Sequence, residues 1–549
     1  MECITKRELC NFEEGNMRTQ FSCLGLSFIL VLALMTFNTP NIILERLPTT
    51  GIRPSSANVE SYYSPHDPIV ISYNVDFKAQ GWPGNGSESN PYLIQYLSFA
   101  SDGICISIST TDVHFRINNC SFSHDTKRGG SRGVLLQTVQ NGAVENCVFV
   151  GLFRCIEANS VSNVLFENNS FYDEFYGMQL AKSVDCVVTN NVFERVGLWL
   201  WGTEENHFLS NFIVNNTVEG KPIAVLMNRL SEAIDASSYG QLFLLNSSKC
   251  IIENGTFDYR NVGVSLALCS DSVIRNIKST YTSVCLVELQ LCINIDVMRC
   301  DIAGSYSQGF RFFYTTDCSL TDCKAGYSVD DWCTGINIFY NENTTIARNV
   351  FQVTGAVGAE NDECLIVDNN VEGRSNVLAP SFTFADSHNF TMDGNELHGV
   401  GTGIAFAHGS TNGTIVNNRI HDNHGYGVRL YAECQGFRIY NNSFWNNEEG
   451  NALDDGFSNS WDDGISLGNR WDDYNGVGFY SISGSAESVD NFPGTYSHDI
   501  PTTATTLTNT TSTTSTQLQP VTVDGLLVIG VSGAIVVVAA IIFVKARRR

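Results

Sequence analysis

Apolar residues recur along most of the chain at the end of a short asparagine-rich phrase, which is clearest at Glu167–Phe171 and Thr189–Phe193. The fifth positions of the related phrases are Phe122, Phe149, Phe171, Phe193, Val218, Phe257, Ser279, Ile302, Ala325, Phe351, Val371, Leu397, Ile420 and Phe444. Twelve of the thirteen successive spacings lie between 20 and 27 residues. A fixed period in that range is typical of a solenoid, in which each repeat packs on its neighbours.

Short runs in which apolar and polar residues alternate flank each phrase. One run precedes it, as at Val161–Phe166, and a second run follows after a glycine, as at Gly177 and Gly427. Period two is the spacing of a β-strand, and no window keeps helical apolar spacing for long. About 22 residues provide three short strands and three turns, which is one coil of a parallel β-helix. The pattern therefore predicts an all-β, single-stranded parallel β-helix of about 14 or more coils.

Stacking of the coils gives each repeated position a physical role. Coils about 4.8 Å apart place equivalent side chains in columns. The asparagines tolerate the left-handed backbone of a sharp turn, and their amides can bond from coil to coil. The fifth-position side chains are expected to point inward as the core, with Ser279 and Ala325 marking thinner coils. The single 39-residue spacing predicts an insertion near Glu219–Gly240, either a loop or an extra irregular coil.

Both ends of a β-helix expose core and unpaired backbone, so caps are expected. At the start, Asp67–Ile71, Gly81–Gly86 and Asn90–Ile94 predict a strand, a glycine-rich turn and another strand over the first coil. At the far end, Asn459–Gly464 and Gly468–Gly476 each contain a tryptophan and an Asp-Asp pair. The two tryptophans can form a lid, and the four aspartates alternatively suit calcium, which prefers oxygen ligands.

These end motifs and the Asn-Asn-x-Phe coils resemble archaeal surface proteins of the right-handed parallel β-helix class. The residues that carry the resemblance are Pro68–Ile71, Trp82–Gly84, Asn90–Ile94 and Gly468–Tyr474. Such proteins are grouped with NosD-like proteins, named for a periplasmic factor in copper-enzyme maturation, and with carbohydrate-binding and sugar-hydrolase (CASH) β-helices. The resemblance covers roughly residues 64–501. It implies a right-handed coil with three parallel sheets, and it is specific for fold and weak for activity.

Segments outside the repeats predict export and membrane attachment. The apolar run Phe21–Phe37 predicts a secretory signal peptide, with an uncleaved N-terminal anchor as the alternative. Leu526–Val544 carries no charge and is followed by basic residues, which predicts a single membrane-spanning helix with its C-terminus in the cytoplasm. The predicted segments are a leader at 1–43, a linker at 44–64, an N-terminal cap with the first coils at 65–117, β-helix repeats at 118–445, a C-terminal cap at 446–494, a Thr/Ser-rich stalk at 495–522, a transmembrane helix at 523–545 and a basic tail at 546–549. The sequence thus predicts a single-pass cell-membrane protein whose β-helix stands outside the cell.

Charge and sequons agree with an exposed, extracellular surface. The net charge of −25 disfavours a nucleic-acid partner, whose phosphates need a basic face. Candidate glycosylation sites are Asn85, Asn246, Asn343, Asn389, Asn412 and Asn509. The alternative is that an asparagine-rich coil generates such triplets by chance.

Eighteen cysteines in an exported protein first suggest disulfides. Their positions instead keep phase with the repeat, since cysteines recur seven or ten residues before the fifth position or at the third position of the phrase. This column-keeping predicts buried free thiols in the core. Cys120/Cys147 and Cys300/Cys323 are the neighbouring pairs most worth testing for a disulfide.

Histidines supply one candidate site. His398 and His421 directly follow the fifth position in consecutive coils, so stacking predicts a separation of about 5 Å. With His424, Asp422 and Glu372 they could form a copper or zinc site. The alternative is a polar turn column that happens to hold two histidines.

Outward positions of the glycine-introduced strands supply a second candidate site, for sugars. The candidate substrate-binding residues are Trp199, Trp201, Arg311, Asn337, Arg429 and Tyr431. The aromatic rings could stack on sugars, and Arg311 or Arg429 could meet an acidic sugar. Burial of both tryptophans beneath the Glu219–Gly240 insertion is the alternative.

The sequence favours a membrane-anchored extracellular module that binds glycans or other cell-envelope components and requires no cofactor. One alternative is a polysaccharide lyase, hydrolase or epimerase acting on the exposed face, although no carboxylate pair repeats at adjacent coils within that sheet. NosD-like copper binding is a further alternative.

Overall fold

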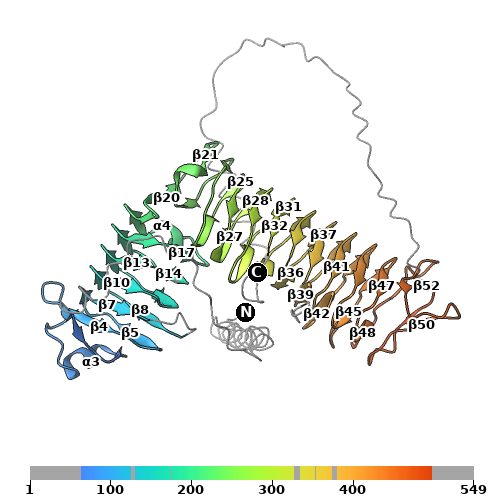
Figure 1. The fold of residues 1–549 in the computed structure, drawn as a ribbon, viewed down its shortest axis with the longest axis horizontal. Coiled ribbons are helices and arrows are strands. Elements are labelled where there is room, and N and C mark those ends of the chain that lie inside the picture. Colours follow the sequence, from blue (N-terminus) through green and yellow to red (C-terminus); the bar gives the residue numbers. More distant parts are fainter. Residues whose placement is uncertain are drawn as a thin grey trace, which may run out of the picture. The chain divides into compact units, whose positions relative to one another are not determined.

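The computed structural model describes residues 63–496 apart from 125–129, 173–174, 327–333, 353 and 374–379. This part of the chain is a right-handed parallel β-helix of about 17 coils (Figure 1). The predicted leader, most of the linker, the stalk, the predicted transmembrane helix, the basic tail and Asn509 lie outside the described residues. Within residues 63–496 the structure contains no helix of the length and apolar character that a membrane span requires.

The first stack of coils, residues 64–218, has three parallel sheets. The first sheet contains β1 (Ser64–Pro65), β4 (Leu97–Phe99), β7 (Ser121–Ser123), β10 (Val148–Val150), β13 (Ser170–Tyr172), β16 (Val192–Glu194) and β19 (Thr217–Val218). The second contains β2 (Ile69–Ile71), β5 (Ile104–Thr111), β8 (Arg132–Val139), β11 (Arg154–Asn159), β14 (Tyr176–Ala181) and β17 (Leu198–Trp201). The third contains β3 (Tyr92–Gln95), β6 (Phe115–Asn118), β9 (Gly142–Glu145), β12 (Leu165–Glu167), β15 (Val187–Thr189) and β18 (Phe212–Val214).

The second stack of coils, residues 221–496, repeats this plan with new sheets. Its first sheet contains β20 (Lys221–Met227), β22 (Gln241–Leu245), β24 (Arg260–Ala267), β27 (Thr282–Gln290), β30 (Gln308–Phe313), β33 (Thr334–Phe339), β36 (Thr354–Ala359), β39 (Phe382–Ala385), β42 (Ile404–Ala407), β45 (Tyr426–Leu430) and β48 (Gly450–Asp454). The second contains β21 (Ala233–Asp235), β23 (Ile251–Glu253), β25 (Ser270–Arg275), β28 (Ile293–Met298), β31 (Ser319–Thr321), β34 (Thr345–Ala347), β37 (Leu365–Val367), β40 (Thr391–Asp393), β43 (Thr414–Val416) and β46 (Arg438–Tyr440). The third contains β26 (Lys278–Ser279), β29 (Asp301–Ile302), β32 (Lys324–Ala325), β35 (Val350–Phe351), β38 (Asn370–Glu372), β41 (Glu396–His398), β44 (Arg419–His421), β47 (Ser443–Trp445), β49 (Arg470–Trp471) and β52 (Gly494–Thr495).

The insertion at Glu219–Gly240 is where one stack ends and the other begins. Here β19 pairs with β20 in antiparallel fashion, whereas the other coil-to-coil pairings are parallel. The segment then forms β21 and the short 3₁₀ helix η1 (Ala236–Ser238). The insertion is therefore an extra irregular coil, which was one of the two expected alternatives.

The predicted core columns are confirmed. Phe149 pairs with Phe171, and Phe171 pairs with Phe193, with ring centroids 5.0 and 4.5 Å apart. All three rings are fully buried. Glycine occurs near the start of the strand that follows the phrase where the core leaves no room for a side chain. A Cβ on Gly335 would lie 2.3 Å from the Phe351 ring.

Asparagines form the predicted ladder between coils. The side-chain Oδ1 of Asn395 accepts bonds from the backbone and amide nitrogens of Asn369, at 3.0 and 2.9 Å. Asn395 in turn donates to Asn418, and Asn418 donates to Asn442. The asparagine one position earlier takes the left-handed backbone, as at Asn417 with φ of 58°. The phrase thus uses its two asparagines for different purposes.

The cysteines are confirmed as buried free thiols within the described residues. Fourteen of the eighteen lie there, and all fourteen are buried and take part in no disulfide. Neither of the two neighbouring pairs singled out for testing forms a disulfide; instead the backbone nitrogen of Cys300 donates to the sulfur of Cys323 at 3.3 Å. Burial raises the pKa of thiols such as Cys318, to about 12.

Both ends carry caps. The N-terminal cap includes a helix that apolar periodicity did not predict, α3 (Asn74–Ala79), because six residues are too few to show it. Its buried Phe77 stacks on Tyr92 at 4.8 Å. A second short helix, α4 (Asn206–Leu209), follows β17.

The predicted tryptophan lid at the far end is confirmed. Trp471 is fully buried and stacks on Phe444 at 4.6 Å, continuing the aromatic column past the last phrase. Its indole nitrogen donates to Asp490, and that of Trp461 donates to Asp454, both at 3.0 Å. The antiparallel pair β50 (Tyr480–Ser481) and β51 (Val489–Asp490) completes this cap.

Candidate functional site

The candidate site lies on the outward side of β27, β30, β33, β36, β39, β42 and β45, which we call the outer face. Strand register aligns one outward column of the face, with members Glu288, Arg311, Asn337, Val357, Thr383, Ala405 and Arg429. It aligns a second column two residues further on, with members Gln290, Phe313, Phe339, Ala359, Ala385 and Ala407. Because successive coils keep this register, chemistry on the face runs along the axis.

Trp199 and Arg311 meet, but they are engaged within the protein. The Trp199 indole donates to Glu288 at 3.1 Å, and Arg311 forms an ion pair with the same carboxylate at 2.6 Å. The Glu288 side chain is 0% exposed and that of Arg311 is 12% exposed. Burial raises the pKa of Glu288, and Arg311 opposes that shift. This pair is therefore a structural contact between the two stacks.

The cover over the tryptophans differs from the expected one. Trp199 packs against Val262, Val284 and Cys285 of the second stack. Trp201 lies 6.0 Å from Phe313 and under the Lys182 ammonium at 5.0 Å. The proposed burial beneath Glu219–Gly240 is thus wrong, because these contacts come from β24, β27 and β30. Sequence could not reveal them, since partners such as Trp199 and Glu288 lie 89 residues apart.

A partly exposed aromatic cluster stands beside Trp201 on the outer face. Tyr314 and Tyr340 stack at 4.5 Å and 10°. Phe313 packs edge-on against both, at 5.0 and 5.6 Å, and Phe339 lies 5.7 Å from Phe313. We call Trp201, Phe313, Tyr314, Phe339 and Tyr340 the aromatic platform.

Two carboxylates continue the line of the platform tyrosines. Glu360 and Asp386 directly follow the aligned residues Ala359 and Ala385, as Tyr340 follows Phe339. Burial raises the pKa of both, and the neighbouring Asp386 charge raises that of Glu360 further. The sequence analysis considered outward strand positions only. It therefore missed Glu360 and Asp386, which occupy the turns after β36 and β39. Comparing the residue that follows the end of each aligned strand would have placed Tyr340, Glu360 and Asp386 in one column.

Asn337 and Arg429 lie further along the first column. The Asn337 amide donates to Gln308 at 2.8 Å and accepts from Thr334 at 2.6 Å, so it is held within the sheet. Arg429 lies 4.2 Å from the centre of the Tyr431 ring, on the outer side of β45. The six predicted sugar-binding residues therefore do not form one site. Two belong to the buried contact, Trp201 belongs to the platform, Arg429 and Tyr431 form a pair, and Asn337 is held within the sheet.

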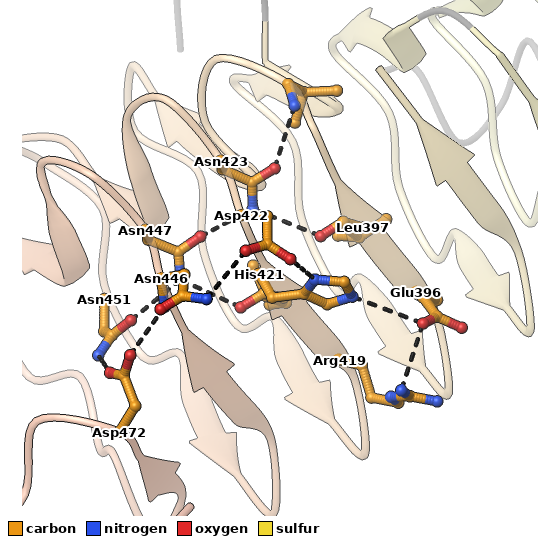
Figure 2. A network of polar contacts seen from close by, with 12 residues as sticks. Glu396, Leu397, Arg419, His421, Asp422, Asn423, Asn446, Asn447, Asn451 and Asp472 are labelled. Carbon is orange, nitrogen blue, oxygen red and sulfur yellow. Dashed lines mark hydrogen bonds and ion pairs between the residues drawn. The ribbon is translucent and has the colours of Figure 1, made fainter. Parts of the chain in front are cut away.

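The histidines stack as predicted, on the outer side of β41 and β44. His398 and His421 lie 5.0 Å apart at 4°, and His421 stacks on Trp445 at 3.9 Å. Figure 2 shows the His421 ring between two carboxylates, with Nδ1 at 2.6 Å from Asp422 and Nε2 at 3.5 Å from Glu396. Arg419 pairs with Glu396 at 3.4 Å. The imidazole is therefore positioned by aromatic and acidic neighbours.

The predicted copper or zinc set does not assemble. In the described part of the chain, no group of three or more His, Cys, Asp and Glu side chains is arranged to hold a metal ion. His398 and His421 face one another as parallel plates, which does not direct their nitrogens to one point. His424 instead pairs with Glu448 at 3.0 Å. Glu372 is aligned with His398 on the side away from His421.

The four aspartates expected to suit calcium bind groups of the cap itself. Asp463 accepts three backbone bonds from residues 465–467, and Asp462 accepts from Gly464 and Asn491. Asp472 and Asp473 both accept from the Asn451 amide. Asp462 and Asp463 thus stabilise their own turn, and Asp472 and Asp473 connect the cap to β48.

Of the six candidate glycosylation asparagines, the five within the described residues are all exposed: Asn85, Asn246, Asn343, Asn389 and Asn412. Three of them donate their amides to the adjacent coil, as Asn343 does to Asp317 at 2.6 Å. A glycan on such an amide would cost that bond. Glycosylation at these positions stays a prediction.

Comparison with family models matches two parts of the chain. Residues 85–218 match the model described as "Right handed beta helix region". Residues 293–476 match "Periplasmic copper-binding protein (NosD)". The chain is a right-handed parallel β-helix protein. Its second stack is similar to NosD over the matched residues, and no curated protein matches its sequence.

Solved β-helix structures match this β-helix protein only distantly. A PL6 alginate lyase in complex with a trisaccharide is 10% identical, with 70% of this chain and 86% of that chain covered and a TM-score of 0.26. The tailspike of E. coli bacteriophage HK620 with a hexasaccharide is 12% identical, with 65% and 71% covered and a TM-score of 0.24. PfbA, a surface adhesin of Streptococcus pneumoniae, is 10% identical, with 68% and 92% covered and a TM-score of 0.23. At these scores the likeness carries no argument about what this chain binds.

Proposed function

We propose that this β-helix protein is a binding module for glycans of the cell envelope and that the outer face is its binding surface. The observation that carries the proposal is the aromatic platform, where Tyr314 and Tyr340 are only partly buried. Ligand sites combine aromatic surface with a few fixed polar groups. On this face the polar groups are Glu360, Asp386 and Arg429, which follow the platform along the axis.

The sequence supports a position at the cell surface. Phe21–Phe37 has the length and composition of an export signal, and Leu526–Val544 those of a membrane-spanning helix. The intervening Thr/Ser-rich residues 495–522 would act as a stalk. The module would then be attached to the membrane through its C-terminal segment and meet envelope glycans outside the cell.

Retention of the purified full chain on a panel of immobilised polysaccharides tests the proposal. We expect at least one polysaccharide to retain the protein, and Tyr340→Asn to lower its affinity about tenfold, equivalent to about 1.4 kcal/mol of lost stacking. Asparagine is chosen because Tyr340 has a left-handed backbone, with φ of 59°.

Phe212→Ala is the matched control, since Phe212 is an aromatic residue with 61% exposure on a different sheet of the first stack. Equal loss in both variants, or no retention of the unmodified chain by any polysaccharide, would contradict the proposal.

A polysaccharide hydrolase is the second candidate function, favoured by Glu360 and Asp386 on consecutive coils. Two carboxylates with different surroundings can divide acid and base roles at a glycosidic bond. The same incubation tests this, because hydrolysis releases new reducing ends and a lyase releases unsaturated ends. Product that is lost in Glu360→Gln and Asp386→Asn would establish the enzyme; retention without product would leave the binding module.

Copper binding receives less support. The NosD description applies to the matched family model, and the described residues of this chain provide no ligand group for a metal.

A further inference from the structure

Arg429 differs from Arg311, the other arginine of the same outward column, in having no oxygen partner among the described residues. Its guanidinium carbon lies 4.2 Å from the centre of the Tyr431 ring and 5.9 Å from that of Tyr426. Arg429 forms no ion pair or hydrogen bond through its side chain with any residue that the structure describes, and its Nε is buried. The aligned residues on the adjoining strands are Ala405 and Leu453, which cannot accept a hydrogen bond through their side chains.

Scarcity of acidic partners does not explain this. The chain has 57 acidic and 32 basic side chains among Asp, Glu, Lys and Arg. Arg311 occupies the same outward column and is paired with Glu288 at 2.6 Å. A half-buried guanidinium without an acceptor carries a free-energy cost that an incoming oxygen group removes.

The geometry around Arg429 suits an anion that presents two adjacent oxygens. A guanidinium presents parallel N–H groups that match the two oxygens of a carboxylate or sulfate. The two tyrosine rings hold the cation by cation–π contact and restrict its orientation. Glu360 and Asp386 belong to a column three residues further along the coil, or roughly 10 Å away, so an anion at Arg429 does not adjoin them.

We propose that Arg429 recognises a carboxylate or sulfate group of an acidic polysaccharide bound along the outer face. This inference rests on the proposed glycan-binding function. From β33, which carries the platform residue Phe339, to β45 there are four coil steps, or roughly 19 Å. One extended oligosaccharide can therefore contact the aromatic platform and Arg429 together.

Two polymer pairs test the proposal with the purified full chain. Polygalacturonate is compared with its fully methyl-esterified form, which removes the carboxylate charge, and dextran sulfate is compared with dextran. We expect the full chain to bind one charged polymer at least about tenfold more tightly than its uncharged counterpart. We expect Arg429→Gln to abolish that difference by lowering the affinity for the charged polymer about tenfold. The polymer pair that shows the difference identifies the carboxylate or the sulfate as the group recognised.

Arg299→Gln is the matched control because it makes the same change in net charge at an exposed arginine, whose guanidinium donates to the sulfur of Met298 at 3.6 Å. Equal loss of affinity in the two variants would overturn the role of Arg429, since only overall charge would then matter. Equal binding of charged and uncharged polymers would overturn it as well, while leaving the proposed glycan-binding function standing. Failure of every polysaccharide in the panel to bind would remove both proposals.

Discussion

Single aromatic side chains contribute strongly because each ring touches the ring above and the ring below. Phe171 lies between Phe149 and Phe193, at 5.0 and 4.5 Å, with nearly parallel planes. Removing one ring opens a cavity that neighbouring coils cannot easily close, because their spacing is fixed by backbone hydrogen bonds.

Phe171→Ala is expected to lower the free energy of unfolding by about 3–5 kcal/mol, the usual cost of truncating a buried aromatic ring. Phe212→Ala removes the same ring from a position that is 61% exposed and should change stability by less than about 0.5 kcal/mol. Urea denaturation followed by circular dichroism measures both. Similar shifts in the two variants would contradict the stacked-core description.

At the scale of elements, strands β41, β44 and β47 align their outward rings in a separate aromatic column, outside the core. His398, His421 and Trp445 continue to Tyr496, which lies 4.4 Å from Trp445 at the end of the described chain. Carboxylates from Glu396 and Asp422 flank the imidazole in the middle. The stability of this aromatic column is therefore expected to depend on the protonation of its histidines.

The pKa of His398 lies below its usual value of 6.5, first because burial disfavours the charged ring and second because His421 is adjacent. As pH falls through 6.5, the unfolded chain binds a proton that the folded chain does not, so the unfolding free energy decreases. His398→Gln removes this loss. The stability of the variant relative to the unmodified chain should therefore rise between pH 8 and pH 5, measured by urea denaturation; a constant difference would contradict the assignment.

At the scale of the whole described chain, the first coils of the second stack cover the open end of the first. Phe243 and Leu245 of β22 point outward from the second stack and belong to the core cluster of the first. Gln241 and Gln290 donate to the backbone carbonyls of Leu198 and Leu200. Glu288 and Arg311 add a buried ion pair to the same contact.

Arg311→Met should lower the free energy of unfolding by about 3–5 kcal/mol, because it leaves Glu288 buried without its partner. Adding Glu288→Gln should recover a large part of that loss, since no uncompensated charge then remains. The control is Arg348→Met, whose partner Asp322 lies 2.9 Å away at an exposed position and should contribute about 0–1 kcal/mol. Chemical denaturation of the three variants distinguishes these outcomes; equal costs for the two single variants would refute the buried contact.

Much of the fold could be predicted because coil stacking makes the sequence repeat what the structure repeats. The columns of Phe171 and Asn395, the buried thiols and the tryptophan lid all follow from position within the period. The α3 cap could not be predicted in this way, since it belongs to no repeat. Glu360 and Asp386 were missed because they lie in the turns that follow β36 and β39, outside the strand positions that the period defines.

The sequence alone determined the period, the inward columns and the order of strands and turns. Each coil uses the same side-chain types for its core and for its asparagine hydrogen-bond ladder, so these features repeat in the sequence. Tertiary structure decided which outward side chains remain available to a ligand. Trp199 and Arg311 are engaged in the contact with Glu288 between the two stacks. That contact exists because the chain reverses at β19–β20 and starts a second stack. Arg429 has no such partner among the described residues, since its strand neighbours present Ala405 and Leu453. Contacts between residues about ninety positions apart leave no mark in a period of 20 to 27 residues.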